Sequence, residues 1–401
     1  MRKNLRQRKW VGLGGGLIIA AAALVYCHWA LTKPLPNLQP SVISLPKVQA
    51  LSGQLNWPKS GQAAVGLVGT DILETAGKQT PTPTASTAKL ITALTVLKAK
   101  PITAGQPGPT ITLTANDANL YATYLAHDGS VVKVVAGEQI SEYQMFQTML
   151  LPSANNMADS LAIWAYGSLA NYAKAANEYL ASLGLQNTHV GKDASGLDPS
   201  TTSTAADLAK IGDLAMQNPV LAGIVAQPTA GNIPVVGNIK NVNFLLGNSG
   251  IVGIKTGNSD QAGGVFVSAA KVAVDGQVQT IVTAYAAAPD LFTAVQGSLP
   301  MIQSAEANFK PVSAITKGSV VGNYNLPWGG QVSAVATSDL NNKIWAGTSI
   351  SAKAKLQAIP AASKSGQDVG SVSANNKSVG VVLDKNVPTP STWWRLTHPF
   401  N

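Results

Sequence analysis

The stretch PTPTASTAKLITAL, residues 81–94, joins a Pro/Thr-rich turn to a helical pattern, and a serine stands at the junction. Leu90 and Leu94 are four residues apart, as on one face of an α-helix. Ser86 lies in the expected first turn, where a serine hydroxyl often satisfies a free backbone N–H. Lys89 follows three residues later, so a helix brings its amine beside the hydroxyl. The stretch predicts either a helix cap or a serine nucleophile with a lysine base.

The Ser-x-x-Lys pattern occurs four times, so the surroundings of each copy have to distinguish them. Ser44 lies in a Pro-rich segment and has a proline inside its motif. Ser130 and Ser268 lie in runs with a β-strand pattern, where residues three apart point to opposite faces. Only Ser86 opens a helical pattern after a predicted hairpin. The residues therefore favour Ser86 as the nucleophile.

The composition is that of a folded chain whose positive charge is concentrated at its start. Apolar residues make up 45% of the 401 residues and charged residues 12%, about half the usual share of about 25%. The net charge is +9, and the basic head, residues 1–9, supplies five of those units, which leaves +4 for the rest. No basic patch of the nucleic-acid-binding kind stands out, so we expect no nucleic-acid partner.

The apolar run at residues 10–31 contains no Asp, Glu, Lys or Arg. About 20 such residues span a bilayer, and flanking cations stay on the cytoplasmic side. A cleaved signal peptide is the alternative, but no small-x-small site ends the run, since His28 and Trp29 precede its last alanine. We expect a single-pass anchor in the cell membrane, with the rest of the chain outside the cytoplasm. Cys27, the only cysteine, lies in this span, which excludes disulfides elsewhere.

Beyond the anchor, the pattern divides the chain into four segments. Residues 32–57 are Pro-rich and predict a stalk. Residues 58–310 run from a hairpin through helices to a second hairpin, which predicts an α/β (α+β) catalytic domain with an antiparallel sheet built from both ends. Residues 311–390 alternate in short stretches and predict a small all-β domain. Residues 391–401 form an aromatic tail, which we expect either at a membrane surface or packed against the β domain.

The chain has no Gly-x-Ser-x-Gly elbow and no His-Glu-x-x-His zinc signature, so we expect a serine nucleophile with a lysine base and no metal or cofactor. Three motifs follow one another along the chain: Ser86-x-x-Lys89, Ser153-Ala154-Asn155 and Lys255-Thr256-Gly257. Their types and order resemble those of penicillin-binding proteins and β-lactamases.

From about residue 60 to 310 the chain resembles the low-molecular-weight penicillin-binding proteins, the serine-type D-alanyl-D-alanine carboxypeptidases. The segments that carry this resemblance are ASTAKLITAL, LLPSANNMADSLA, LASLGLQNTHV, ASGLDPSTTSTAADLAKIG and GIKTGNSDQAGG. The resemblance implies a β-lactamase/transpeptidase-like fold, an antiparallel sheet with a helical subdomain, followed by a small C-terminal all-β domain. It implies peptidoglycan stem peptides ending in D-Ala-D-Ala as substrates and β-lactams as covalent inhibitors.

The resemblance also implies a role for each motif residue. Ser86 would attack the penultimate carbonyl and form an acyl-enzyme, with Lys89 as its base and Ser153 as a proton relay. Burial and a second cation such as Lys255 would lower the pKa of Lys89. The backbone N–H groups of Ser86 and Asn258 would form the oxyanion hole. The residues implied to bind substrate are Asn155, Lys255, Thr256, Gly257 and Asn258.

The chain departs from the family pattern at two places. Asn156 stands where the family usually has an aspartate. No arginine occurs between Arg8 and Arg395, although family members often place one after Lys-Thr-Gly, near the substrate carboxylate. The carboxylate therefore has to be held by other groups.

Two alternatives remain beside the carboxypeptidase. The first is a β-lactamase-related hydrolase, which would need a glutamate after Ser-x-Asn to activate water for deacylation. Glu178 is the only glutamate between Asn155 and Lys255, and it lies in a helical pattern, so we expect slow deacylation of penicillin. The second is a non-catalytic penicillin-binding or wall-binding protein.

Overall fold

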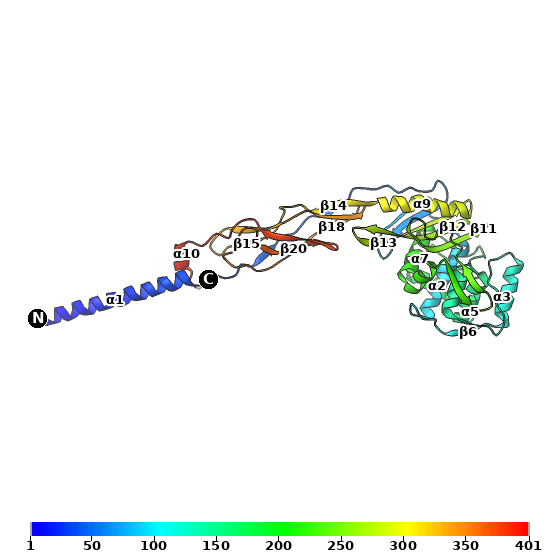
Figure 1. Cartoon of the computed structure of the whole chain (residues 1–401), viewed down its shortest axis with the longest axis horizontal. Coiled ribbons are helices and arrows are strands. Elements are labelled where there is room, and N and C mark those ends of the chain that lie inside the picture. The colour runs from blue at the N-terminus through cyan, green and yellow to red at the C-terminus, as the bar shows by residue number, and fades with distance from the viewer. Residues whose placement is uncertain (1, 400–401) are drawn as a thin grey trace. The chain divides into compact units, whose positions relative to one another are not determined.

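In a computed structural model, residues 2–399 are described, with side chains from residue 15 onward. Contacts divide the chain into two compact units: Gly53–Phe309, and a second unit made of the segments up to Ser52 and from Lys310 (Figure 1). The first residue of the predicted basic head and the last two of the predicted aromatic tail lie outside the described residues.

The unit Gly53–Phe309 is built around a five-stranded antiparallel sheet with the order β11-β12-β13-β3-β4. The early hairpin and the late hairpin join where β13 pairs with β3, so the prediction of a sheet built from both ends is confirmed. An Asp-Gly turn connects β12 to β13, as expected from the sequence. The strands are β3 (Gln62–Leu67), β4 (Leu73–Ala76), β11 (Ile251–Ser259), β12 (Gly263–Val274) and β13 (Gln277–Ala288).

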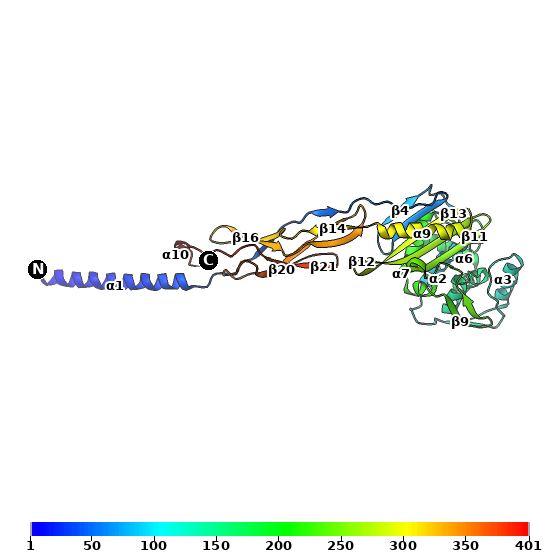
Figure 2. The same cartoon turned by 45° about the horizontal axis from the view of Figure 1, so that its top comes forward.

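Helices cover both faces of this sheet (Figure 2). Val282 of β13 lies against Gly212 of α7 (Ala205–Gln217), whereas Tyr285 lies against Gly297 of α9 (Leu291–Ala307). Residues three apart in a strand point to opposite faces, so α7 and α9 sandwich the sheet. The helical subdomain adds α2 (Ala88–Ala99), α3 (Ala115–Ala126), α4 (Glu142–Leu150), α5 (Asn155–Tyr166), α6 (Leu169–Ser182) and α8 (Pro219–Val225).

Short strand pairs connect the helices. The backbone of Ser130, which we expected in a strand, lies in the loop between α3 and β7 instead. The reason is that the start of α5, and not a neighbouring strand, holds this loop: the Asn155 N–H donates to the Ser130 carbonyl oxygen at 2.7 Å, and the Asn156 side chain bonds the N–H and the C=O of Val132, at 3.1 and 2.8 Å. The short strands are β5 (Thr82–Pro83), β6 (Thr110–Thr112), β7 (Gln139–Ser141), β8 (Thr202–Ser203), β9 (Thr229–Ile233) and β10 (Gly237–Lys240).

The second unit is rich in β-strands, with a six-stranded sheet in the order β1-β15-β16-β21-β20-β19. Along β16, Val332, Ala334 and Ala336 are buried and alternate with more exposed residues, which is the period-two pattern of a strand with one covered face. The strands from the C-terminal part are β14 (Phe309–Ile315), β15 (Val320–Asn325), β16 (Gln331–Ala336), β17 (Leu340–Trp345), β18 (Ser349–Ser351), β19 (Lys353–Leu356), β20 (Asp368–Ala374) and β21 (Lys377–Leu383).

The segment that we expected to be a stalk, residues 32–57, contributes strands to this unit. β1 (Pro40–Val42) pairs with β15, and β2 (Lys47–Gln49) pairs with β18. A proline without an N–H is tolerated at the start of an edge strand, so a Pro-rich composition did not prevent pairing here.

The chain begins with α1 (Arg2–Thr32). Within it, Gly15–Thr32 has a mean hydropathy of 1.6 and is long and apolar enough to cross a membrane. It is the one such helix among the described residues, and its position near the N-terminus fits a membrane anchor or a signal sequence alike.

Glu142, the first residue of α4, has a buried carboxyl group to which the described part of the chain provides no hydrogen bond. Its side chain is fully buried, and neither carboxylate oxygen has a hydrogen-bond partner within residues 2–399. Burial raises the pKa of Glu142 to about 7, although the charge of Lys100 acts in the opposite direction. The folded state thus favours the protonated carboxyl group.

We expect Glu142→Gln to stabilise the protein at pH 8 and to have little effect at pH 5. A raised pKa means that stability is lost as the pH rises through about 7, and glutamine removes the buried charge. The expected gain at pH 8 is about 1–3 kcal/mol in the free energy of unfolding by urea. Glu178→Gln, at an exposed position of α6, is the control. An equal gain at both pH values would contradict the explanation.

Candidate active site

Ser86 lies in a 3₁₀ turn, Ala85–Thr87, that leads directly into α2. The preceding residue, Ala85, has a φ of 45°, a left-handed conformation that costs a non-glycine residue free energy. Lys89 is the second residue of α2, and its Nζ is 2.8 Å from Ser86 Oγ. Ser86 is half-buried, whereas the Lys89 side chain is fully buried. The hydroxyl therefore faces accessible space while its neighbouring amine does not.

The Lys89 amine has two further partners at hydrogen-bond distance. Its Nζ donates to Asn155 Oδ1 at 2.8 Å and to the carbonyl oxygen of Ser195 at 3.0 Å. Burial lowers the pKa of Lys89 to about 7, while the negative charges of Asp193 and Asp159 act to raise it. Near neutral pH a substantial fraction of the amine is therefore unprotonated and able to accept a proton.

A second hydroxyl–amine pair lies beside the first. Lys255 of β11 donates from Nζ to Ser153 Oγ at 2.9 Å and to the carbonyl oxygen of Thr256 at 2.9 Å. Burial, and then the positive charge of Lys89, lowers the pKa of Lys255 well below its usual value. Ser153 has a φ of 67° and lies two residues before Asn155, the first residue of α5. This left-handed residue is a second site of backbone strain.

β11 brings the Lys-Thr-Gly motif against the start of α2. A Cβ at Gly257 would lie 3.0 Å from the carbonyl oxygen of Thr84 and 3.1 Å from the backbone nitrogen of Ser86, so a side chain at position 257 would push the strand and the serine turn apart by a few tenths of an ångström. Thr256 is buried, and Asn258 at the next position is exposed. β11 is also the outermost strand of its sheet, which leaves one edge free of a partner strand.

The fold thus gathers the eight predicted site residues in three groups. In the first group, Lys89 is hydrogen-bonded to both Ser86 and Asn155. In the second group, Lys255 is hydrogen-bonded to Ser153. The third group is Thr256, Gly257 and Asn258, which β11 carries past the start of α2.

A loop inside the segment ASGLDPSTTSTAADLAKIG completes the surroundings of Lys89, although the sequence did not predict its contact with the amine. The carboxylate of Asp193 accepts hydrogen bonds from the backbone N–H of Gly196 at 2.7 Å and of Asp198 at 2.8 Å. This tight turn presents the Ser195 carbonyl to Lys89. The run DASGLD matches the family resemblance, but no residue spacing indicates that a backbone oxygen from this segment contacts the amine.

Asp159 is a second residue that affects the pKa of Lys89 and that the sequence did not reveal. Its Oδ1 accepts from the Ala194 N–H at 2.9 Å and its Oδ2 from the Tyr124 hydroxyl at 2.6 Å. Burial is the main cause that raises the pKa of Asp159 to about 6, and the two hydrogen bonds oppose it. Asp159 lies one helical turn after Asn155 on α5, so it links the site to the turn that contains Ser195.

Asn156 occupies the position of the usual family aspartate, and its role is structural. The side chain is fully buried and bonds both backbone groups of Val132. An amide supplies one donor and one acceptor for this purpose, whereas an ionised carboxylate could only accept.

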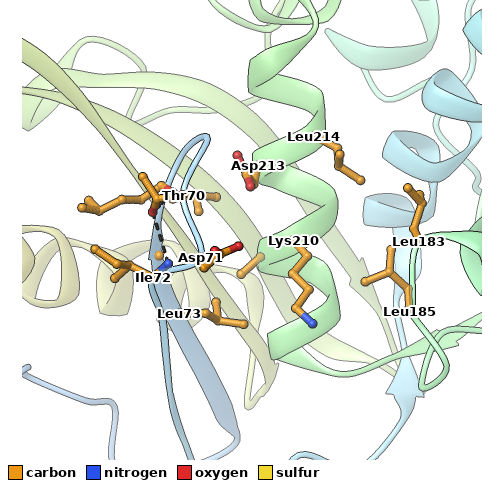
Figure 3. A pocket seen from close by; sticks show the side chains of 13 residues that line it. Thr70, Asp71, Ile72, Leu73, Leu183, Leu185, Lys210, Asp213 and Leu214 are labelled. Atoms are coloured by element: carbon orange, nitrogen blue, oxygen red, sulfur yellow. Dashed lines mark hydrogen bonds between the residues drawn. The ribbon is translucent and has the colours of Figure 1, made fainter. Parts of the chain in front are cut away.

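A pocket of about 400 Å³ lies elsewhere on this unit, between the β3–β4 turn, α7 and the segment after α6. Figure 3 shows Lys210 and Asp213 extending from α7 beside Thr70 and Asp71 of the turn. Asp213 Oδ1 accepts the N–H of Gly69 at 2.8 Å and so closes the turn. None of the eight predicted residues lines this pocket, so it belongs to the scaffold beside the site.

Comparison with known proteins agrees with this geometry. A model of the D-alanyl-D-alanine carboxypeptidase family matches residues 64–285. The D-alanyl-D-alanine carboxypeptidase DacB2 of Mycobacterium tuberculosis is 34% identical over 194 residues, 47% of this chain and 62% of that protein. DacA of Escherichia coli, also a D-alanyl-D-alanine carboxypeptidase, is 28% identical over 168 residues, 41% of each chain. This chain therefore spans less than two thirds of the length of either relative.

Solved structures support the fold. A Streptomyces DD-transpeptidase superposes with a TM-score of 0.53 at 24% identity, over 65% of this chain and 98% of that one. Penicillin binding protein 5 from Haemophilus influenzae has a TM-score of 0.56 at 20% identity, over 86% of this chain and 99% of that one. The predicted β-lactamase/transpeptidase-like fold is confirmed.

We expect Gly196→Ala to destabilise the protein much more than Gly184→Ala. Both glycines have a left-handed φ, +77° and +72°, so each alanine costs about 1–2 kcal/mol of backbone strain. Only at Gly196 would the new Cβ also collide with the carbonyl oxygen of Ala85, at 2.1 Å, since Gly184 faces open space. Unfolding in urea measures both variants. Equal losses would show that the loop does not pack tightly against the serine turn.

Proposed function

This chain belongs to the D-alanyl-D-alanine carboxypeptidase family, and we propose that it removes the terminal D-alanine from peptidoglycan stem peptides through a Ser86 acyl-enzyme. The observation that carries the proposal is the buried Lys89 amine, 2.8 Å from Ser86 Oγ, with a pKa lowered to about 7. An amine that is partly neutral at physiological pH can take the serine proton as the nucleophile attacks.

In the acylation step, the Ser86 oxygen attacks the carbonyl carbon of the penultimate D-alanine, and its proton moves to Lys89. The tetrahedral oxyanion then lies between the backbone N–H groups of Ser86 and Asn258, which the packing of Gly257 on the serine turn supports. Breakage of the C–N bond releases the last D-alanine and leaves an ester on Ser86. Water attacks this ester and restores the serine.

The leaving amine needs a proton, and Ser153 is placed to transfer it. Its hydroxyl lies 2.9 Å from Lys255 Nζ, and both side chains are more than nine-tenths buried. Asn155 has its Oδ1 on Lys89, which fixes the amide so that its NH₂ group can bind a substrate carbonyl. A Cβ added at Gly129 would lie 2.9 Å from Asn155 Nδ2, so a side chain at position 129 would displace this amide.

The substrate carboxylate is bound by Lys255 and Thr256 in this proposal, because no arginine is present in the catalytic unit. A terminal carboxylate would also raise the pKa of Lys255 and so favour its ammonium form. The free edge of β11 suits an extended peptide, which would add to the sheet as a further strand.

The β-lactamase-related alternative needs a glutamate that activates water for deacylation, and the one glutamate between Asn155 and Lys255 does not match this role. Glu178 is exposed on α6 and has no hydrogen bond to any of the site residues. We therefore propose that penicillin acylates Ser86 and is hydrolysed slowly. Rapid turnover of penicillin would instead favour the alternative.

We further propose that Gly15–Thr32 is retained as a single-pass anchor, with both folded units outside the cytoplasm. Its 18 residues have a mean hydropathy of 1.6, and at 1.5 Å per residue they span about 27 Å, close to the hydrocarbon thickness of a bilayer. The basic residues before it favour the cytoplasmic side for the N-terminus.

Release of D-alanine from a pentapeptide ending in D-Ala-D-Ala tests the activity. We expect wild type to release it and Ser86→Ala to lose both this release and covalent labelling by fluorescent penicillin. The same peptide with an amidated C-terminus is the matched control, and we expect a large loss of kcat/KM because the carboxylate contact is missing. Penicillin labelling of wild type without release of D-alanine would leave the non-catalytic penicillin-binding alternative.

The rate of acylation by penicillin should rise with pH through about 7. Below the pKa of Lys89 the amine is protonated and cannot act as a base, so the rate should fall about tenfold per pH unit. Asp159→Asn removes a negative charge that raises the Lys89 pKa, so its profile should move to lower pH. Asp213→Asn, at the β3–β4 turn, should leave the midpoint unchanged. A midpoint that is the same in all three proteins would refute the assignment of Lys89.

A further inference from the structure

The short C-terminal helix α10 (Thr392–Thr397) lies against the end of α1, although the two are more than 350 residues apart in the chain. The Tyr26 hydroxyl donates to the carbonyl oxygen of Leu396 at 2.6 Å. Arg395 donates from Nη1 to the carbonyl oxygens of Leu31 at 2.7 Å and Lys33 at 3.0 Å. The Lys33 amine in turn donates to the carbonyl oxygen of Pro399. The bonds run in both directions between the two segments.

These bonds satisfy groups that a helix end leaves open. The last four carbonyl groups of an α-helix have no partner inside the helix, and the negative end of its dipole favours a cation. Arg395 supplies both a donor and a positive charge to the end of α1. A cleaved signal sequence would remove Tyr26 and Leu31, and with them the groups that Leu396 and Arg395 contact.

Aromatic contacts join α10 to the β-rich unit as well. Trp394 packs edge-on against Trp328 with ring centroids 5.6 Å apart, and stacks on His398 at 5.1 Å. Trp328, in the β15–β16 connection, donates from Nε1 to the carbonyl oxygen of Pro388 at 2.8 Å. Trp394 is thus held at the junction of α10, the end of α1 and the β15–β16 connection, whereas the adjacent Trp393 is 75% exposed.

The side chains at this junction are aromatic, apolar or basic. A shallow cleft there is lined by Ala30, Lys33, Pro34, Leu35, Trp394, Arg395, His398 and Pro399, with no acidic residue among them. Tyr26 and Trp29 on α1 are 41% and 42% exposed, and Lys33 Nζ lies 5.7 Å from the centre of the Trp29 ring. Tryptophan, tyrosine and basic side chains at the end of an apolar helix are typical of the layer where lipid headgroups meet water.

We propose that residues 391–399 and the end of α1 form one lipid-binding collar, which holds the β-rich unit at the headgroup layer. Trp393 and Trp29 lie at the headgroup boundary, and Lys33 and Arg395 face lipid phosphates. The occupant is a phospholipid surface and not a soluble anion, because the collar sits where the apolar Gly15–Thr32 stretch ends. This inference rests on the proposed anchor and does not depend on the proposed activity.

A spin label reports on the position of the collar in the full chain. The protein carries Cys27→Ser and a single new cysteine, either Thr392→Cys beside Trp393 or Asn376→Cys in the exposed β20–β21 turn. Each protein is reconstituted into vesicles of equal parts phosphatidylethanolamine and phosphatidylglycerol. The collision rates of the label with oxygen and with a water-soluble nickel chelate give its depth. We expect an oxygen-to-nickel ratio several-fold higher at position 392 than at 376.

Variants test the side chains that make the collar. Trp393→Ser and Arg395→Gln should each lower the ratio at position 392 towards that of 376, whereas Lys364→Gln, a charge loss at an exposed site of the same unit, should not. Resistance of the chain to carbonate extraction shows separately whether α1 is inserted. An inserted chain with equal ratios at 392 and 376 would overturn the collar but keep the anchor. Extraction of wild type by carbonate would overturn both, and D-alanine release would remain an independent measurement.

Discussion

The buried amine of Lys89 is the constraint on which the unit Gly53–Phe309 depends. A lysine without solvent carries a large desolvation penalty, and here that penalty lowers its pKa to about 7. Every partner of the amine comes from a different part of the chain: Ser86 from the start of α2, Asn155 from α5, and the Ser195 carbonyl from a loop. The fold therefore has to bring three segments together around one nitrogen atom.

The sheet and the strained turns serve this arrangement. β11 passes so close to the serine turn that a Cβ at position 257 would be only 3.0 Å from the carbonyl oxygen of Thr84, and Lys255 of the same strand reaches Ser153. Ala85 and Ser153 both adopt left-handed conformations beside the reactive groups. Such strain persists only where the surrounding packing holds it, and the buried helices α2 and α5 supply that packing.

Sequence patterns predicted the secondary structure correctly where it depends on nearby residues. Periodicity and turn residues predict the helix that follows Ser86, the two hairpins and the alternating strands of the β-rich unit, because each of these depends on neighbours within about ten positions. Ser130 shows the limit of this reasoning: its surroundings have the composition of a strand, but the amide of Asn156 holds them as a loop. The Pro-rich segment was misjudged for a related reason, since pairing of β1 with β15 depends on residues almost 300 positions away.

By itself the sequence predicted which residues carry the proposed chemistry, and it determined their order along the chain and the spacing that places Lys89 beside Ser86. It could not determine the contributions of Asp159, the Ser195 carbonyl and the contact of Arg395 with the end of α1. Asp159 acts through the effect of its negative charge on the buried Lys89 amine. The other two contacts are made to backbone carbonyl oxygens, which every residue type possesses. Only the tertiary structure decides which of those oxygens meets a given donor, and how far burial shifts the pKa of the lysine that the sequence had identified.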